Sequence, residues 1–173
     1  MYNKWNDVKG KIDSQSPLIH CITSPIAIND CANAVLALGA KPIMAEHPLE
    51  VENITLMSKS LAVSLANITD ARAESIMISG KAACKAGIPS VIDLVGVTCS
   101  KMREDLAKKY ITQCRPAVIK GNVSEIKAVC GMGFDASSGI DVSDKDKVDS
   151  ANPKSIEEMS YIVKNYAAAN GWV

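Results

Sequence analysis

The stretch AVIKGNVSEI, residues 117–126, changes character in its middle and shows how the chain is organised. It begins as an apolar run that is too short for a helix and is typical of a buried strand. It then passes through Gly121 into a segment in which apolar residues recur at helical spacing. The stretch therefore predicts a strand over 116–121 that leads directly into a helix over 123–130.

Four further apolar runs of similar length, each beside turn residues, also predict strands. They cover residues 17–22, 41–45, 60–66 and 88–95. Helical patterns lie between them and after them. The expected helices run from Ser24 to Gly39, after Pro48, from Thr69 or Asp70 to Gly87, over about 100–113, and over about 154–170. In the first of these, we expect Ser24 to be the N-cap and Pro25 the first helical residue.

Strands that alternate with helices imply right-handed crossovers and a mainly parallel sheet with helices on both faces. The sequence therefore predicts a layered α/β fold, and its length of 173 residues favours one domain over residues 1–173.

The balance of charge excludes some classes of partner. The formal net charge is zero and the charged residues, 22% of the chain, are interspersed, so no basic stripe predicts binding to nucleic acid. The first residues are too polar for a signal peptide, and no apolar run reaches the roughly 20 residues of a membrane helix. We therefore expect a cytoplasmic protein with a small-molecule or protein partner.

The six cysteines include no C-x-x-C pair, and several fall in apolar periodic segments, which predicts buried, reduced thiols. The two histidines, His20 and His47, have no helix-spaced ligand partner, so the sequence predicts no zinc site.

Three residues are expected at the carboxyl ends of strands, the edge where parallel α/β sheets bind ligands. They are Met44, Asp93 and Lys120. Lys120 can neutralise phosphate oxygens. Asp93 can act near a metal or a transferred phosphate or can simply form a turn, and both interpretations stay open. Met44 can press against an apolar ring, although methionine is more often a core residue.

The helix that follows Lys120 offers a carboxylate in its first turn. Glu125 could hold magnesium or its waters, because hard cations prefer carboxylate oxygen. Asn122 followed three residues later by Glu125 is also a capping-box pattern, and spacing alone favours this second interpretation. The common glycine-rich nucleotide motifs and G-x-S-x-G are absent. The residues alone therefore predict an α/β domain with an anion site.

Two longer stretches carry a family resemblance. Residues 16–51, SPLIHCITSPIAINDCANAVLALGAKPIMAEHPLEV, and residues 119–131, IKGNVSEIKAVCG, closely resemble hydroxyethylthiazole kinase, a thiamine-salvage enzyme of the ribokinase-like superfamily. The A-L-G-A-x-P-x-M and G-N-x-x-E-I segments are specific to that family. The resemblance covers about the N-terminal two-thirds of the family's length and implies a ribokinase-like fold.

The resemblance also implies a function. It predicts phosphoryl transfer from ATP, with magnesium, to the primary alcohol of 4-methyl-5-(2-hydroxyethyl)thiazole, in a homotrimer whose thiazole sites lie between subunits. By position, Met44 would contact the thiazole, and Lys120 and Asn122 would lie at the ATP phosphates. Asp93 and Glu125 would serve the magnesium and phosphate region, and a carboxylate at Glu125 can both cap the helix and serve there.

Four residues depart from the family pattern near the predicted pocket. Lys120 replaces the usual arginine and loses bidentate phosphate geometry. Ser24 replaces an asparagine, Ala66 a glycine, and Leu94 a proline with its fixed backbone angle.

The last third of the family pattern has no counterpart. The family's G-T-G-C segment, which forms the anion hole and supplies the catalytic cysteine, would lie beyond Val173, so no catalytic residue is assigned here. Without an anion hole the expected rate loss is on the order of 10³ or more. The sequence thus predicts a kinase domain that lacks its C-terminal part. The alternatives are a non-catalytic subunit that binds thiazole or nucleotide or assembles with other chains, and a relic without ligand function.

Overall fold

The computed structural model describes residues 2–131 and 152–171, with side chains described from Trp5 onward. Helices and strands alternate along the chain, as the sequence predicts. In order, the elements are α1 (Tyr2–Gln15), β1 (Leu18–Ile22), α2 (Ile28–Ala37), β2 (Lys41–Ile43), α3 (Val51–Met57), β3 (Ser60–Ser64), α4 (Asp70–Ala86), β4 (Ser90–Asp93), the 3₁₀ turn η1 (Val97–Cys99), α5 (Lys101–Cys114), β5 (Val118–Lys120), α6 (Val123–Val129) and α7 (Pro153–Ala169).

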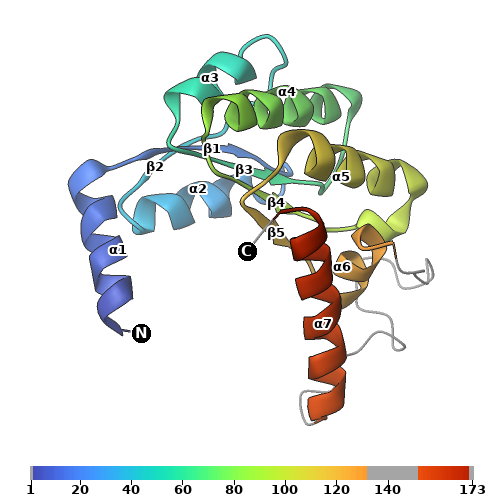
Figure 1. The fold of residues 1–173 in the computed structure, drawn as a ribbon. Coiled ribbons are helices and arrows are strands. Elements are labelled where there is room, and N and C mark those ends of the chain that lie inside the picture. Colours follow the sequence, from blue (N-terminus) through green and yellow to red (C-terminus); the bar gives the residue numbers. More distant parts are fainter. Residues whose placement is uncertain (1, 132–151, 172–173) are drawn as a thin grey trace.

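The five strands form one sheet in the order β2-β1-β3-β4-β5, and every pairing in it is parallel (Figure 1). The register pairs Ser64 with Asp93 and Asp93 with Lys120 at the carboxyl ends of β3, β4 and β5. Since all five strands run the same way, the loops that follow them gather at one edge, where the sequence places its candidate residues.

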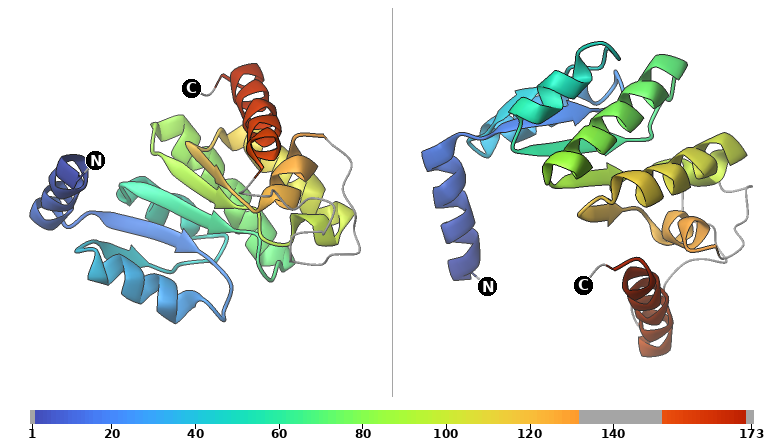
Figure 2. Two further views of the ribbon diagram at one scale, coloured as in Figure 1. Left: turned by 90° about the horizontal axis from the view of Figure 1, so that it is seen from below. Right: turned by 45° about the horizontal axis from the view of Figure 1, so that its top comes forward.

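Helices cover both faces of the sheet (Figures 1 and 2). The helices α3, α4 and α5 pack on one face, and α2 lies on the opposite face beneath β1 and β2. This division follows from handedness, because the sheet grows in one direction through α2 and in the other through α3, α4 and α5. The predicted α/β layered fold with a parallel sheet is therefore confirmed.

The core lies between the sheet and the α3, α4 and α5 layer. Side chains from the central strands meet those of α4 and α5, including the fully buried Ile76 and Tyr110. Gly80 lets the two helices approach, because a Cβ atom there would lie 2.4 Å from Cε2 of Tyr110 and 2.6 Å from Sγ of Cys114. The glycine at this helical position is thus required by packing rather than by backbone conformation.

The predicted ends of α4 are confirmed. Thr69 is the N-cap, since its Oγ1 accepts the N–H of Arg72 at 3.2 Å, and Gly87 ends the helix in the left-handed region with φ 68°. The observed strands are one to four residues shorter than the predicted runs, because backbone pairing covers only part of each apolar pattern.

The prediction that Ser24 caps a helix is wrong. Its carbonyl accepts the N–H of Ala27 at 3.0 Å, which closes a single turn, and α2 begins only at Ile28 with Ala27 as N-cap. The N–H of Ala27 is satisfied by the carbonyl three residues back, and the first i to i−4 bond of the helix comes from Cys31. The predicted stop is confirmed, because Gly39 has φ 87° just after the C-cap.

The helix α1 was not predicted. Its sequence is polar, and the described side chains in it are mostly exposed, so hydrophobic periodicity gives little signal. Gly39 marks where it meets the sheet layer, because a Cβ atom at Gly39 would lie 2.4 Å from a carboxylate oxygen of Asp13.

Within the described residues, no helix has both the length and the hydropathy needed to cross a membrane.

Candidate functional site at the carboxyl edge of the sheet

An exposed ion pair marks the carboxyl ends of β4 and β5. Asp93 and Lys120 are the last residues of these strands and pair in register, and Nζ of Lys120 lies 3.1 Å from Oδ1 of Asp93. The lysine side chain is 68% exposed, so the pair contributes little to stability and the ammonium group is accessible to an anionic ligand. The predicted juxtaposition of these two residues is confirmed, while their roles stay predictions.

The turn after β5 is closed by a capping box. Oδ1 of Asn122 accepts the N–H of Glu125 at 2.9 Å, and Oε2 of Glu125 accepts the N–H of Asn122 at 2.8 Å. The capping interpretation that the spacing favours is therefore confirmed. A glycine suits position 121, because a Cβ atom there would be crowded at 3.1 Å from Cβ of Glu125.

Glu125 does more than cap its own helix. Its second oxygen, Oε1, accepts the N–H of Gly96 in the turn after β4 at 3.0 Å, and the residue is 4% exposed. One buried carboxylate thus joins the turn after β4 to the turn after β5. Both oxygens are already used by backbone donors, so any contact with a cation would be made in addition to these bonds.

The structure shows how two of the departures from the family pattern are accommodated. The N–H of Leu94 donates to the carbonyl of Lys120 at 2.8 Å, a bond that a proline at this position could not make. Ala66 is not among the residues with positive φ; the left-handed residue of that loop is the next one, Asn67, with φ 50°. The alanine is therefore accommodated without backbone strain.

Met44 lies at the other end of the same edge. It follows the last residue of β2 and is half-buried. The strands β2 and β5 are four spacings apart in the sheet, which corresponds to roughly 19 Å. The structure thus places Met44 on the predicted edge but far from Lys120. If two ligands bind along this edge, Met44 could contact one of them and Lys120 the other.

A buried histidine that sequence reasoning did not assign to the site anchors the loop after β2. His20 is fully buried, with Nε2 2.9 Å from the carbonyl oxygen of Ala45 and Nδ1 2.8 Å from Oγ1 of Thr55. The carbonyl can only accept, so Nε2 carries the proton and Nδ1 accepts from the threonine hydroxyl. Burial lowers the pKa of His20 below its ordinary 6.5, which is consistent with a neutral ring.

A buried arginine, also missed, holds the next residue of that loop. Nε and Nη2 of Arg72 donate to Oε2 of Glu46 at 3.1 and 2.7 Å, and Nη1 donates to the carbonyl of Asn67 at 2.5 Å. The hydroxyl of Ser75 donates to the Glu46 carbonyl at 2.8 Å. A signal was present in the sequence, because a cation in the first turn of a helix opposes the helix dipole and indicates an anionic partner elsewhere.

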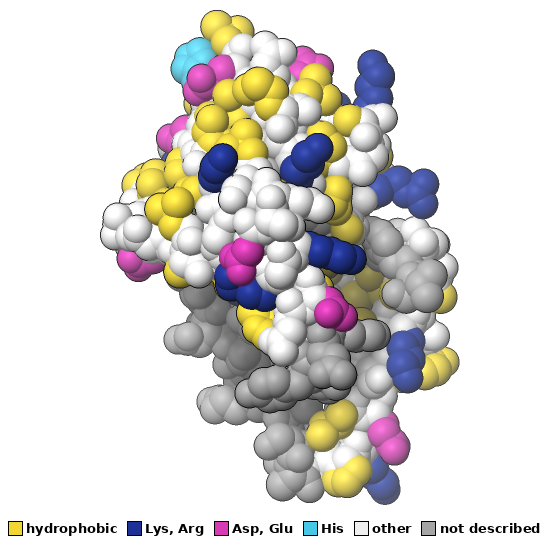
Figure 3. Space-filling model, turned by 90° about the vertical axis from the view of Figure 1, so that its left-hand side faces the viewer, with side chains coloured by type: hydrophobic (Ala, Val, Ile, Leu, Met, Phe, Trp, Pro, Cys, Tyr) yellow, Lys and Arg dark blue, Asp and Glu magenta, His cyan; other side chains and the backbone are white. Residues whose placement is uncertain are grey.

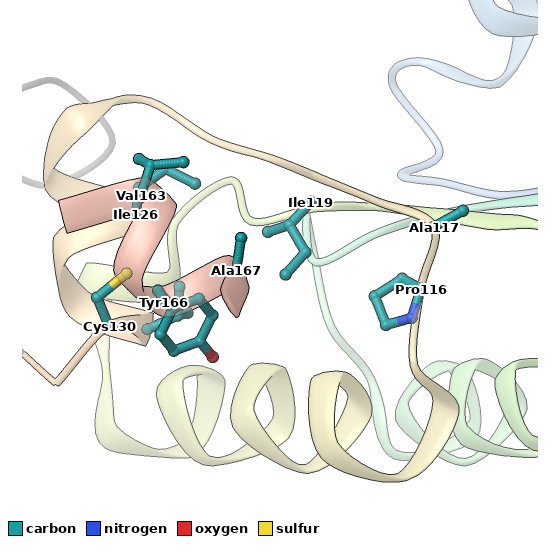
Figure 4. Close-up of a pocket in the computed structure, with 9 residues that line it drawn as sticks. Pro116, Ala117, Ile119, Ile126, Cys130, Val163, Tyr166 and Ala167 are labelled. Carbon is teal, nitrogen blue, oxygen red and sulfur yellow. The ribbon is translucent and has the colours of Figure 1, made fainter. Parts of the chain in front are cut away.

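An apolar cavity lies between β5, α6 and α7. It has a volume of about 160 Å³ and is lined by apolar side chains of β5, α6 and α7, among them Ile119, Ile126 and Tyr166 (Figure 4). Burial raises the pKa of both Tyr166 and Cys130 there. This cavity offers no charged group for a phosphate.

In the parts of the chain that the structure describes, no group of three or more His, Cys, Asp or Glu side chains is arranged to hold a metal ion. All six cysteines are free thiols, as predicted, but Cys84 and Cys99 are exposed, so the expectation that the thiols are buried is wrong for these two.

Comparison with known proteins gives a consistent result. The sequence model of the hydroxyethylthiazole kinase family matches residues 10–168. Hydroxyethylthiazole kinase 2 of Clostridium botulinum strain Hall is 54% identical over 166 residues, which are 96% of this chain and 61% of that protein. Hydroxyethylthiazole kinase of Finegoldia magna is 46% identical over 129 residues, 75% of this chain and 48% of that protein.

A solved structure agrees with the sequence comparisons. The structure of a hydroxyethylthiazole kinase protein from Pyrococcus horikoshii OT3 superposes with a TM-score of 0.68 at 30% identity, covering 72% of this chain and 49% of that one. The chain thus spans about half to two-thirds of the length of these relatives.

Proposed function

Because the chain belongs to the hydroxyethylthiazole kinase family, we propose that it takes part in phosphoryl transfer from ATP to the primary alcohol of 4-methyl-5-(2-hydroxyethyl)thiazole, in thiamine biosynthesis or salvage. The observation that carries the proposal is the accessible Asp93–Lys120 pair at the carboxyl edge of the sheet, beside the turn that Glu125 and Asn122 close. An α/β sheet binds its ligands at that edge.

The nucleotide would lie at the β4 and β5 end of the edge. Lys120 would exchange its exposed partner Asp93 for phosphate oxygens, as a point charge rather than as a bidentate fork. Asn122 lies next to this position, and the turn that carries it is fixed by the buried bonds of Glu125. The triphosphate would thus bind against a turn whose backbone is already fixed. Phosphoryl transfer depends mainly on such positioning and on charge.

The residues present fit a magnesium ion that is bound mostly through water and phosphate. Magnesium typically takes one or two protein carboxylates and completes its shell with water and substrate phosphates. Asp93 would supply the accessible carboxylate. Glu125, whose oxygens already accept backbone N–H groups, would lie farther from the ion and add its negative charge to the site. The ion would supply charge neutralisation at the transferred phosphate.

The thiazole would lie at the β2 end. A sulfur-containing ring suits the polarizable side chain of Met44, and the roughly 19 Å between β2 and β5 leaves room for an alcohol and a triphosphate to meet between the two ends. Each ligand would therefore have its own part of one continuous edge.

A homotrimer is proposed together with this activity. Three apolar side chains at or near α2 are exposed: Ile26 by 91%, Leu36 by 55% and Leu38 by 42%. Figure 3 looks onto the side of the molecule that carries α1, α2 and α3, and hydrophobic side chains gather over its upper half. Contiguous exposed apolar side chains, such as those on the side seen in Figure 3, mark surfaces that other chains cover. We place the protein in the cytoplasm, where ATP is made and where free thiols stay reduced.

The proposal is tested by incubating the protein with magnesium-ATP and the thiazole alcohol and measuring the phosphate ester by mass spectrometry. The proposal expects ester that requires both ATP and the protein. Binding of both ligands without ester would favour the non-catalytic alternative, and absence of binding would overturn the proposal.

A further inference from the structure

We propose that Arg72 is a positioning residue that joins the loop after β2 (residues 44–46) to the loop after β3 (residues 65–67), so that the two loops form one wall of the ligand-binding edge. The inference rests on the proposed function in one respect, which is that Met44 in the first loop contacts the thiazole. The geometry of the joint itself is independent of any ligand.

The guanidinium group divides its donors between the two loops. Two of its N–H groups reach the Glu46 carboxylate, from Nε at 3.1 Å and from Nη2 at 2.7 Å, and a third reaches the carbonyl of Asn67 at 2.5 Å. These loops follow strands that are not neighbours in the sheet, because β1 lies between β2 and β3. The planar fork of an arginine can hold both at once, whereas a lysine ammonium offers no such fixed geometry.

The two partners of this ion pair differ in burial. The Arg72 side chain is 4% exposed while that of Glu46 is 46% exposed, so the cation is held in the protein and the anion is brought to it from the loop. A cation in the first turn of α4 is disfavoured by the helix dipole, and a buried charge is costly unless it is paired. The two loop contacts offset both costs, so loosening either loop would leave a buried charge short of partners.

The loop after β2 has few other attachments. Ala45 is held by His20, and the carbonyl of Glu46 by the hydroxyl of Ser75, which lies one turn after Arg72 on α4. The anchors thus begin at the residue that follows Met44. Removing the arginine should free the Glu46 side chain and the Asn67 carbonyl together, and Met44 should become more mobile because the loop then keeps only the His20 and Ser75 anchors.

A purely stabilising role makes a different prediction from a positioning role. If Arg72 only contributes stability, any variant of equal stability should behave in the same way. If it positions the loops, motion should rise at residues 44–47 and 65–68 alone, and affinity for the thiazole should fall while affinity for ATP, at the other end of the edge, stays unchanged.

The test compares Arg72→Ala and Arg72→Lys with two control variants on the same helix. Ile76→Val removes one methylene from the buried core and lowers stability without removing a hydrogen bond to either loop, and Lys85→Ala removes an exposed positive charge. Backbone ¹⁵N order parameters report the motion of the loops, and calorimetry with the thiazole alcohol and with ATP reports the two affinities.

We expect order parameters at residues 44–47 of about 0.85 in the unmodified chain and in both controls, and below about 0.6 in Arg72→Ala. Thiazole affinity should fall about tenfold or more in Arg72→Ala and ATP affinity should change less than about twofold, with Arg72→Lys intermediate. The double variant Arg72→Ala with Glu46→Ala should bind thiazole no more weakly than Arg72→Ala alone, because the two residues act as one unit.

Unchanged order parameters in both Arg72 variants would overturn the inference, as would equal changes in Ile76→Val. If Arg72→Ala does not fold, Arg72→Lys carries the same comparison. If the unmodified chain binds no thiazole, the proposed function fails, and the order parameters still decide whether Arg72 joins the loops.

Discussion

Replacing Glu125 tests the buried joint between the turns after β4 and β5. In Glu125→Gln, the amide oxygen can still accept one backbone N–H, but the amide NH₂ group faces the other N–H as a second donor. One of the two bonds, to Gly96 at 3.0 Å or to Asn122 at 2.8 Å, is therefore lost in a site that is 4% exposed. Glu125→Ala loses both.

The magnitudes follow from burial. A buried donor left without a partner costs about 1–3 kcal/mol, so Glu125→Gln should lower the free energy of unfolding by about 2 kcal/mol. Glu125→Ala, which gives up two bonds to a charged acceptor, should cost about 3–6 kcal/mol. In a chain of 173 residues, a loss of 2 kcal/mol corresponds to a fall in Tm of roughly 4–8 °C.

Urea unfolding followed by circular dichroism measures these differences. The control is Glu52→Gln, which removes the same charge from the first turn of α3 at an exposed position and should cost less than about 1 kcal/mol. If Glu125→Gln were as stable as Glu52→Gln, the carboxylate would not be holding the two turns together, and the reasoning for this joint would be refuted.

Three further predictions follow from the structure. Lys120→Ala should weaken ATP binding about tenfold and Lys120→Arg should strengthen it, because an arginine regains the bidentate fork; calorimetry checks both, and equal affinities would contradict the role. Gly80→Ala should lower the Tm, since its Cβ atom would lie 2.4 Å from Tyr110, and a Tm equal to that of the unmodified chain would disprove the close approach. His20 has a lowered pKa in the folded state, so its contribution to stability is present above about pH 6.5 and is lost as the pH falls below that value, because the unfolded chain then binds the proton more tightly. Urea midpoints at pH 7.5 and 5.5 should show a smaller fall in a His20→Asn variant than in the unmodified chain, and an equal fall would exclude this contribution.

The fold was largely predictable because its signals are local. The strand before Gly121, the cap at Thr69 and the stop at Gly87 depend on residues next to one another in the chain, and the structure confirms them. The helix α1 was missed because it buries little and so carries little apolar periodicity. The start of α2 was misplaced because a serine followed by proline fits an isolated turn as well as a helix N-terminus.

The candidate site was predictable only in part. The rule that parallel α/β sheets bind ligands at the carboxyl ends of their strands predicted that Asp93 and Lys120 share one edge, and spacing predicted the capping box of Glu125. The bond from Glu125 to Gly96, and those from Arg72 to Glu46, join residues 26 to 29 positions apart, and no local pattern specifies such pairs. For the Arg72 contacts alone, the sequence offers the indirect sign of a positive charge placed where a helix disfavours it.

The formation of phosphate ester from the thiazole alcohol and magnesium-ATP tests the central claim most directly, when it is measured side by side for the unmodified chain, Asp93→Ala and Lys120→Ala. The account predicts ester from the unmodified chain and a rate at least tenfold lower in each variant. Ester formation at the same rate in all three proteins would contradict the placement of the site, and the absence of both ester and ligand binding in the unmodified chain would contradict the proposed function.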